Sequence, residues 1–229
     1  MTKHTLFVGG CSFSDRFDSN DICWGELLAS KLNLEYNHDA VVSSGSNSRI
    51  WRVLTDKIIS GEITSKDKVF IQYTDNTRKE FATWTNPMAD HVKEKFGNSE
   101  FEELYLIRYK DKSHIWYGDK NISSLLKNYE LYASMDEYDN YSFNQRQLQF
   151  QTLLNYYNID AYILAVNVYQ NWDQLVKYDI LPEFKNKIFK DSNIGHAENE
   201  RYSEEDMCHL SETGCEIMAE NVHSWLNNR

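Results

Sequence analysis

The sequence predicts an α/β fold of three layers, in which a central parallel sheet lies between two layers of helices. Short apolar runs alternate with longer segments whose apolar residues recur at helical spacing, in the order strand, helix, strand, helix, strand. The apolar runs are nearly continuous, which is typical of parallel strands buried on both faces. Successive parallel strands are joined by right-handed crossovers, so we expect helices on both faces of the sheet.

The first third of the chain alternates three predicted strands with two predicted helices. The strands are the apolar runs at 4–10, 39–44 and 68–74. The helices lie between them, at 21–33 and 47–61, because apolar side chains recur there every three or four residues. Asp21 is the expected N-cap of the first helix, and Gly61 is expected to end the second.

The middle of the chain, at about 79–142, follows neither the helical nor the strand period. It is acidic and rich in Tyr and Trp, and we interpret it as an irregular elaboration on the sheet. A long helix over 140–160 should then lead into a fourth strand over 161–169. The last predicted helix covers 211–228, with Ser211 as its N-cap.

Length and charge restrict the class of protein. The 229 residues contain no repeat, linker or low-complexity stretch, so we expect residues 1–229 to form a single domain. A net charge of −11 argues against a nucleic-acid partner, since such binding rests on clustered Lys and Arg. The N-terminus does not have the pattern of a signal peptide, and no apolar run approaches the roughly 20 residues of a membrane span. We therefore expect a cytoplasmic protein; its oligomeric state stays open.

Neither the cysteines nor the acidic residues have the spacing of a metal site. None of the four cysteines forms a C-x-x-C pair, which a zinc ribbon or a thioredoxin-like motif would need. The acidic run at 15–21 lacks the alternating ligands and the closing Glu of a calcium loop. We therefore expect buried free thiols, and no metal or organic cofactor.

Polar residues gather where the predicted strands end and where the last helix begins. In open parallel sheets ligands bind at the carboxyl ends of the strands, so these positions are the candidate site. In chain order they are Gly10, Cys11 and Ser12 after the first strand, Gly45 and Asn47 after the second, Asn76 and Arg78 after the third, and Asp206 and His209 before the last helix.

These residue types suit acyl transfer. A serine hydroxyl needs a neutral imidazole to take its proton, and the imidazole needs a carboxylate to fix its tautomer. Ser12, His209 and Asp206 would fill these roles, and the Asp-x-x-His spacing lets one turn present both partners on the same side. The developing oxyanion would be held by the backbone N–H groups of Ser12 and Gly45 and by the side-chain amide of Asn76.

Four blocks of the sequence resemble the SGNH (GDSL-like) hydrolases. Members carry Gly-Asp-Ser after the first strand, a Gly-containing turn after the second, Gly-x-Asn-Asp after the third and Asp-x-x-His before the last helix. The matching blocks here are Gly10-Cys11-Ser12, Ser44-Gly45-Ser46-Asn47, Thr74-Asp75-Asn76-Thr77 and Asp206-Met207-Cys208-His209. The resemblance implies a flavodoxin-like SGNH hydrolase fold and a serine esterase that cleaves carboxylic esters through an acyl-enzyme. Its substrates would be small-molecule, carbohydrate or lipid esters, such as O-acetyl groups on carbohydrate, or thioesters.

Two of these blocks depart from the family pattern. Cys11 stands where the family has Asp, and the third block keeps Asn76 but lacks the glycine and the final Asp. The Gly-Cys-Ser-Phe first block is similar to a branch found in bacteria and large phages. Asn47 and Arg78 are candidate substrate contacts. Asn47 is more simply explained as a cap of the second helix, whereas for Arg78 two alternatives stay open, a contact with a charged group of the substrate and an ion pair with Glu80.

Other classes of protein also fit this sequence. The altered blocks favour, as an alternative, a catalytically degenerate SGNH-fold module that binds a ligand or has a structural role. A nucleotide-binding flavodoxin-like domain would need a phosphate-cradling loop and a stacking aromatic, and GGCSFS meets half of that requirement. Ser12 by itself could be a turn serine that satisfies backbone N–H groups.

Overall fold

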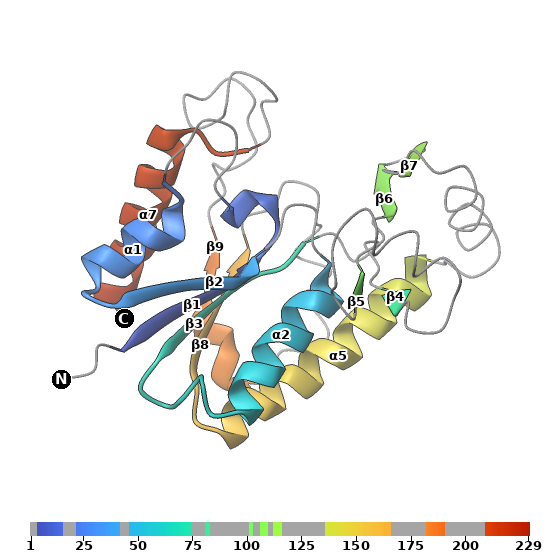
Figure 1. Ribbon diagram of the computed structural model, residues 1–229, viewed down its shortest axis with the longest axis horizontal. Helices are drawn as coiled ribbons and strands as arrows, with labels where there is room; N and C mark the ends of the chain where they lie inside the picture. The colour runs from blue at the N-terminus through green and yellow to red at the C-terminus, as the bar shows by residue number, and fades with distance from the viewer. Residues whose placement is uncertain are drawn as a thin grey trace.

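The computed structural model describes residues 4–15, 22–41, 46–74, 136–165, 182–190 and 209–229, together with four short strands between 81 and 115. Five parallel strands form the central sheet, in the order β2-β1-β3-β8-β9 (Figure 1). Their bounds are β1 Thr5–Gly10, β2 Glu35–Val41, β3 Lys68–Gln72, β8 Asp160–Ala165 and β9 Ile188–Lys190. The predicted parallel sheet is confirmed.

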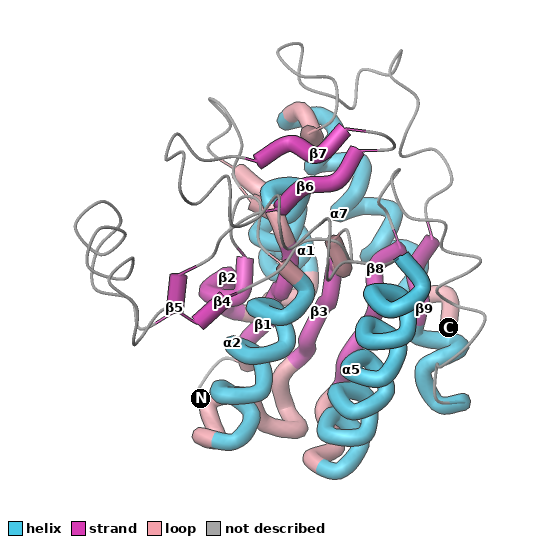
Figure 2. The backbone as a smooth tube through the Cα atoms, turned by 90° about the vertical axis from the view of Figure 1, so that its right-hand side faces the viewer, coloured by secondary structure: helices cyan, strands magenta, loops and turns pink. Residues whose placement is uncertain are grey.

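Helices cover both faces of this sheet, as the sequence predicts. Helix α1 (Trp24–Lys31) packs beside α7 (Glu212–Asn227) on one face, and α2 (Asn47–Ile59) lies beside α5 (Asp136–Tyr156) on the other (Figures 1 and 2). Two short 3-10 helices, η1 (Ser12–Ser14) and η2 (Pro182–Lys187), follow β1 and precede β9. The three-layer α/β/α architecture is therefore confirmed.

The two hydrophobic cores follow from the period of two along each strand. Leu6 and Val8 of β1 point toward α1 and α7, whereas Phe7 between them points toward α2 and α5. Strands β3 and β8 divide their side chains in the same way. Strands β1, β3 and β8 are buried on both faces. Each of them is therefore a nearly continuous apolar run and not an alternation of apolar and polar residues.

Three predictions about helix ends can be compared with the structure. Ser211 is the N-cap of α7, since its hydroxyl accepts a 3.0 Å hydrogen bond from the N–H of Gly214. The prediction for α1 is wrong: the helix begins later, at Trp24, so Cys23 holds the N-cap position, and the predicted cap Asp21 lies outside the described residues. Helix α2 ends just before Gly61, whose φ of +78° is the left-handed conformation that glycine adopts at low cost.

The sequence analysis predicts neither β9 nor the four short strands between 81 and 115, and it places the start of β2 too late. β9 has three residues, too few to show a hydrophobic pattern, and β2 begins four residues before its predicted start because exposed polar residues form its first part. Within the predicted irregular segment two antiparallel pairs form, β4 (Phe81–Ala82) with β5 (Phe101–Glu102) and β6 (Leu106–Tyr109) with β7 (Lys112–Ile115).

Candidate active site

The two glycines at the end of β1 make room for two different layers of the fold. A Cβ atom on Gly9 would lie 2.7 Å from Cγ2 of Ile50, so this glycine lets α2 pack directly on the strand. A Cβ atom on Gly10 would lie 2.6 Å from Oγ of Ser14 and 3.2 Å from Oε1 of Gln72. The Gly-Gly pair is therefore required by close packing at both positions.

The chain turns sharply after Gly10. The N–H of Ser14 donates a 2.8 Å hydrogen bond to the carbonyl of Cys11, which closes the single turn of η1. Ser12 lies within this turn, at the carboxyl end of β1, where the sequence predicts the nucleophile. The structure describes the backbone of Ser12 but not its side chain.

A buried chain of hydrogen bonds lies beneath this turn. The indole Nε1 of Trp24 donates to Oγ of Ser14 at 3.3 Å, and Ser14 in turn donates to Oε1 of Gln72 at 2.5 Å. Nε2 of Gln72 donates to Sγ of Cys11 at 3.6 Å. All four side chains are buried, so the turn after β1 is tied to both α1 and β3.

Neither Gln72 nor the indole of Trp24 is among the site residues that the sequence predicts. The signal for Gln72 was present, because an amide in the run VFIQY interrupts an otherwise apolar strand. A buried amide is stable only when its donor and acceptor are both paired, so such a residue indicates a specific polar partner. The partners themselves lie 58 and 61 residues away along the chain.

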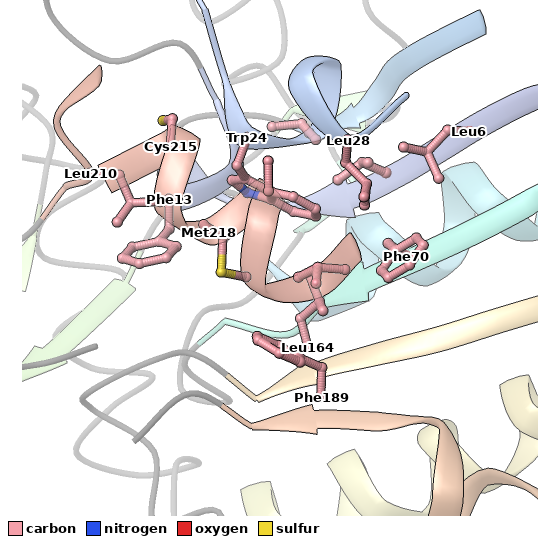
Figure 3. Close-up of a cluster of buried hydrophobic side chains, with 14 of the residues drawn as sticks. Leu6, Phe13, Trp24, Leu28, Phe70, Leu164, Phe189, Leu210, Cys215 and Met218 are labelled. Atoms are coloured by element: carbon pink, nitrogen blue, oxygen red, sulfur yellow. The ribbon is translucent and has the colours of Figure 1, made fainter. Parts of the chain in front are cut away.

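His209 lies next to a residue of the hydrophobic core between the sheet and helices α1 and α7. It is half-buried, and it directly precedes Leu210, which is 4% exposed. Leu210 and Phe13, the residue after Ser12, belong to one hydrophobic cluster with Met218 of α7 (Figure 3). The segments that carry Ser12 and His209 are thus anchored in a shared cluster.

Asn47 connects the second and third blocks. Its Nδ2 donates to the carbonyl of Thr74 at 2.9 Å, and its Oδ1 accepts from the N–H of Thr74 at 2.8 Å. The N-cap of α2 is Ser46, whose hydroxyl accepts from the N–H of Arg49, so the interpretation of Asn47 as the cap is wrong. A contact of Asn47 with substrate stays a prediction; the described role of its amide is to hold the start of α2 against the end of β3.

Several predicted site residues lie outside the described residues: Gly45, Asn76, Arg78 and Asp206. The triad and the oxyanion hole therefore stay predictions. The expectation of buried free thiols is confirmed for Cys11, Cys23 and Cys215, and burial, with a contribution from Cys23, raises the pKa of Cys215 to about 12. Within the described ranges, no three His, Cys, Asp or Glu side chains cluster as metal ligands would, and no helix has the length and apolar character to cross a membrane.

The chain is similar to known proteins in its fold but not in its sequence. No family model and no curated protein matches the chain. Solved structures match it over almost its full length. One is a G-D-S-L family protein described as lipolytic, from Desulfitobacterium hafniense, with a TM-score of 0.53 and 11% identity over 96% of this chain and 98% of that one. The chain has the SGNH hydrolase fold.

Two further solved structures match the chain over a similar length. The psychrotrophic esterase EstA from a Pseudoalteromonas species matches with a TM-score of 0.56 and 10% identity, over 98% of this chain and 97% of that one. The lipase Lip_vut3 from a goat rumen metagenome matches with a TM-score of 0.50 and 12% identity, again over 98% and 97%. At such identities the likeness is one of SGNH fold, and the chemistry must be argued from the residues.

Proposed function

We propose that this protein is an SGNH-type serine esterase that hydrolyses carboxylic esters through an acyl-enzyme. The observation that carries the proposal is the shared cluster of Phe13 and Leu210, which anchors the Ser12 turn and the His209 segment in the same core. The turn lies at the carboxyl end of β1, where α/β sheets bind their ligands. The esterase and lipase neighbours support the same reaction class.

In the proposed mechanism the hydroxyl of Ser12 attacks the carbonyl carbon of the ester and passes its proton to His209. Asp206 orients the imidazole and stabilises the imidazolium that forms. The oxyanion is held by the N–H groups of Ser12 and Gly45 and by the amide of Asn76. When the tetrahedral intermediate collapses, the alcohol leaves with the proton from His209. Water, deprotonated by His209, then attacks the acyl-enzyme and releases the carboxylic acid and the free serine.

We propose further that residues 1–229 form one domain that acts without a cofactor. The substrate class is a small-molecule, carbohydrate or lipid ester, with Arg78 as a candidate contact for a charged group. With a net charge of −11, the protein should favour neutral esters over strongly anionic ones, because its summed field repels anions.

The test uses a fluorophosphonate probe and a short-chain aryl ester on the purified protein and on Ser12→Ala. We expect the parent to be labelled and to hydrolyse the ester, and Ser12→Ala to do neither while keeping the melting temperature of the parent. Ser60→Ala is the matched control, because Ser60 is an exposed serine at the end of α2 and should behave as the parent does. Equal labelling of Ser12→Ala and the parent would reject Ser12 as the nucleophile.

A second candidate function is a ligand-binding or structural module that keeps the SGNH fold without turnover. Cys11 in place of the family Asp and the reduced third block favour it. Loss of one oxyanion donor lowers kcat by about 10²–10³, so a displaced Asn76 would leave a slow enzyme and not an inactive one. A folded parent that neither reacts with the probe nor releases aryl alcohol during prolonged incubation would select this second function.

A further inference from the structure

Gln72 is a polar residue at the centre of the sheet. It is the last residue of β3, it is 0% exposed, and it pairs with Leu164 of β8, while its neighbour Ile71 pairs with Gly9 of β1. Burial of an unpaired amide is unfavourable, so an apolar side chain would be the simpler choice at this position. Its presence indicates a task that an apolar side chain cannot perform.

Both ends of the Gln72 amide are bound to a single turn. Oε1 accepts from Ser14, and Nε2 donates to Cys11. Cys11 directly precedes η1 and Ser14 is its last residue, and the backbone bond from the N–H of Ser14 to the carbonyl of Cys11 closes the same turn. Ser12 is therefore enclosed in a ring that is closed by its own backbone and by one side chain from the neighbouring strand.

Two other residues hold this ring in place. Gly10 has no side chain, and the space that its Cβ would need is filled by Ser14 and Gln72. Trp24, which is 0% exposed, donates to Ser14 from α1, so the hydroxyl of Ser14 both receives and donates a hydrogen bond. With its donor and acceptor fixed, Ser14 has one favourable orientation, and so does the amide of Gln72.

We propose that Gln72 is a positioning residue that sets the backbone of the Ser12 turn for nucleophilic attack. The inference rests on the proposed function and extends it to a residue that none of the four sequence blocks contains. Gln72 acts through Cys11 and Ser14 and does not touch the substrate. Displacement of a reacting group by about 1 Å can lower a rate by about 10²-fold, so loosening the turn should lower kcat and leave substrate binding in place.

The same contact gives Cys11 a physical role. Position 11 holds Asp in the SGNH pattern, and here the donor from Gln72 meets a thiol in its place. The sulfur of Cys11 is a weak acceptor, and its contact with Gln72 links the turn to β3. Cys11 is 3% exposed and belongs to the same hydrophobic cluster as Phe13, so position 11 is part of the core.

The experiment compares the parent with Gln72→Met, which keeps the length of the side chain but removes its donor and acceptor. The matched control is Gln151→Met, because Gln151 is a buried glutamine, 1% exposed, on α5 in the opposite layer. We expect Gln72→Met to lower kcat and the rate constant of fluorophosphonate labelling by about 10- to 100-fold, with KM within about twofold. Gln151→Met should keep kcat, KM and the labelling rate within about twofold of the parent, although its melting temperature also changes.

If Gln72→Met does not fold, the variant Gln72→Glu tests the positioning role of Gln72 instead. Burial raises the pKa of a carboxyl group introduced at this position, and its protonated form can still accept from Ser14 and donate toward Cys11. The activity of Gln72→Glu relative to the parent should therefore rise as the pH is lowered. A purely structural role would shift stability with pH but would leave the relative kcat of the folded protein flat.

The outcomes separate the two proposals. If the parent is labelled, Ser12→Ala is not, and Gln72→Met keeps a kcat within twofold of the parent, the positioning role is rejected and the esterase stands. The positioning role is also rejected if the kcat of Gln72→Glu, relative to that of the parent, does not change with pH. If the folded parent neither reacts nor hydrolyses the ester, the proposed function fails, and the role of Gln72 fails with it.

Discussion

The hydroxyl of Ser14 donates a 2.5 Å hydrogen bond to Oε1 of Gln72, and both side chains are fully buried. This bond joins the turn after β1 to the end of β3, 58 residues further along the chain. It lies against Gly10, where any larger residue would displace it. The contact therefore ties the turn that contains Ser12 to β3.

Ser14→Ala should lower the free energy of unfolding by about 1–3 kcal/mol, because Gln72 loses its donor and Trp24 loses its acceptor inside the core. Urea denaturation followed by tryptophan fluorescence measures the change. Ser60→Ala is the control, since Ser60 is exposed, and it should stay within about 0.5 kcal/mol of the parent. Equal stabilities of the two variants would show that the buried bond contributes little.

Gly10→Ala should destabilise the protein by about 1–3 kcal/mol, since its new Cβ would lie within contact distance of Ser14. The measurement is a double-mutant cycle with Ser14→Gly, which removes the side chain that the new Cβ would meet. We expect the combined variant to be more stable than the sum of the two single changes predicts, by at least about 0.5 kcal/mol. Strict additivity would contradict the steric explanation.

Asn47→Ala should lower the free energy of unfolding by about 2–4 kcal/mol, because the N–H and the carbonyl of Thr74 both lose their buried partner. The variant should also lower kcat, since Asn47 fixes the ends of the two segments that lead to Gly45 and Asn76. Denaturation and steady-state kinetics test the two effects separately. Unchanged kcat in a destabilised variant would restrict Asn47 to a structural role.

Asp206→Ala and His209→Ala should each retain the fold and lose most of the activity. Removal of the carboxylate from a serine triad lowers kcat by about 10⁴, because the imidazole loses its orientation and its tautomer. Kinetics with the aryl ester and circular dichroism of each variant provide the test. Full activity of Asp206→Ala would reduce the proposed triad to a Ser12–His209 dyad.

Asp160 makes stability depend on pH at the amino end of β8, the end of the parallel sheet away from the candidate site. Partial burial raises its pKa, but the hydrogen bond and charge of Lys68, with smaller contributions from Tyr162 and Lys187, outweigh burial and lower the net pKa. The group is therefore charged in the folded state at a pH where the unfolded chain binds a proton. Its contribution is fully present above the ordinary Asp pKa of about 3.9 and is lost as the pH falls through the lower folded value.

The variant Asp160→Asn measures this contribution. The difference in unfolding free energy between the parent and Asp160→Asn should be largest near pH 6 and should shrink below about pH 4. Urea denaturation at pH 6, 4 and 3 tests it, with Glu220→Gln as the control, because Glu220 forms an exposed pair with Lys31 that solvent screens. If the difference stays constant with pH, the charge of Asp160 does not contribute, and its contacts with Lys68, Tyr162 and Lys187 stabilise the fold through packing alone.

The sequence by itself determined the architecture and the candidate nucleophile turn. Continuous apolar runs of five or six residues predict buried parallel strands. This pattern lies within each strand and does not depend on the sequence of the loops. The cap Ser211 and the end of α2 before Gly61 could be predicted for the same reason, since each depends on a few adjacent residues. Short or partly exposed strands such as β9 and the start of β2 carry too few apolar residues to be recognised.

Only the tertiary structure decided which side chains meet beneath Ser12. Gln72, Cys11 and Trp24 come from three elements, and no spacing along the chain relates an amide on β3 to a thiol after β1. The role of Asn47 was misread for the same reason: a polar residue at a helix start suggests a cap, and its actual partner, Thr74, is 27 residues away. Local patterns determine elements because backbone conformation depends on near neighbours, whereas a polar contact inside a core depends on how distant elements pack.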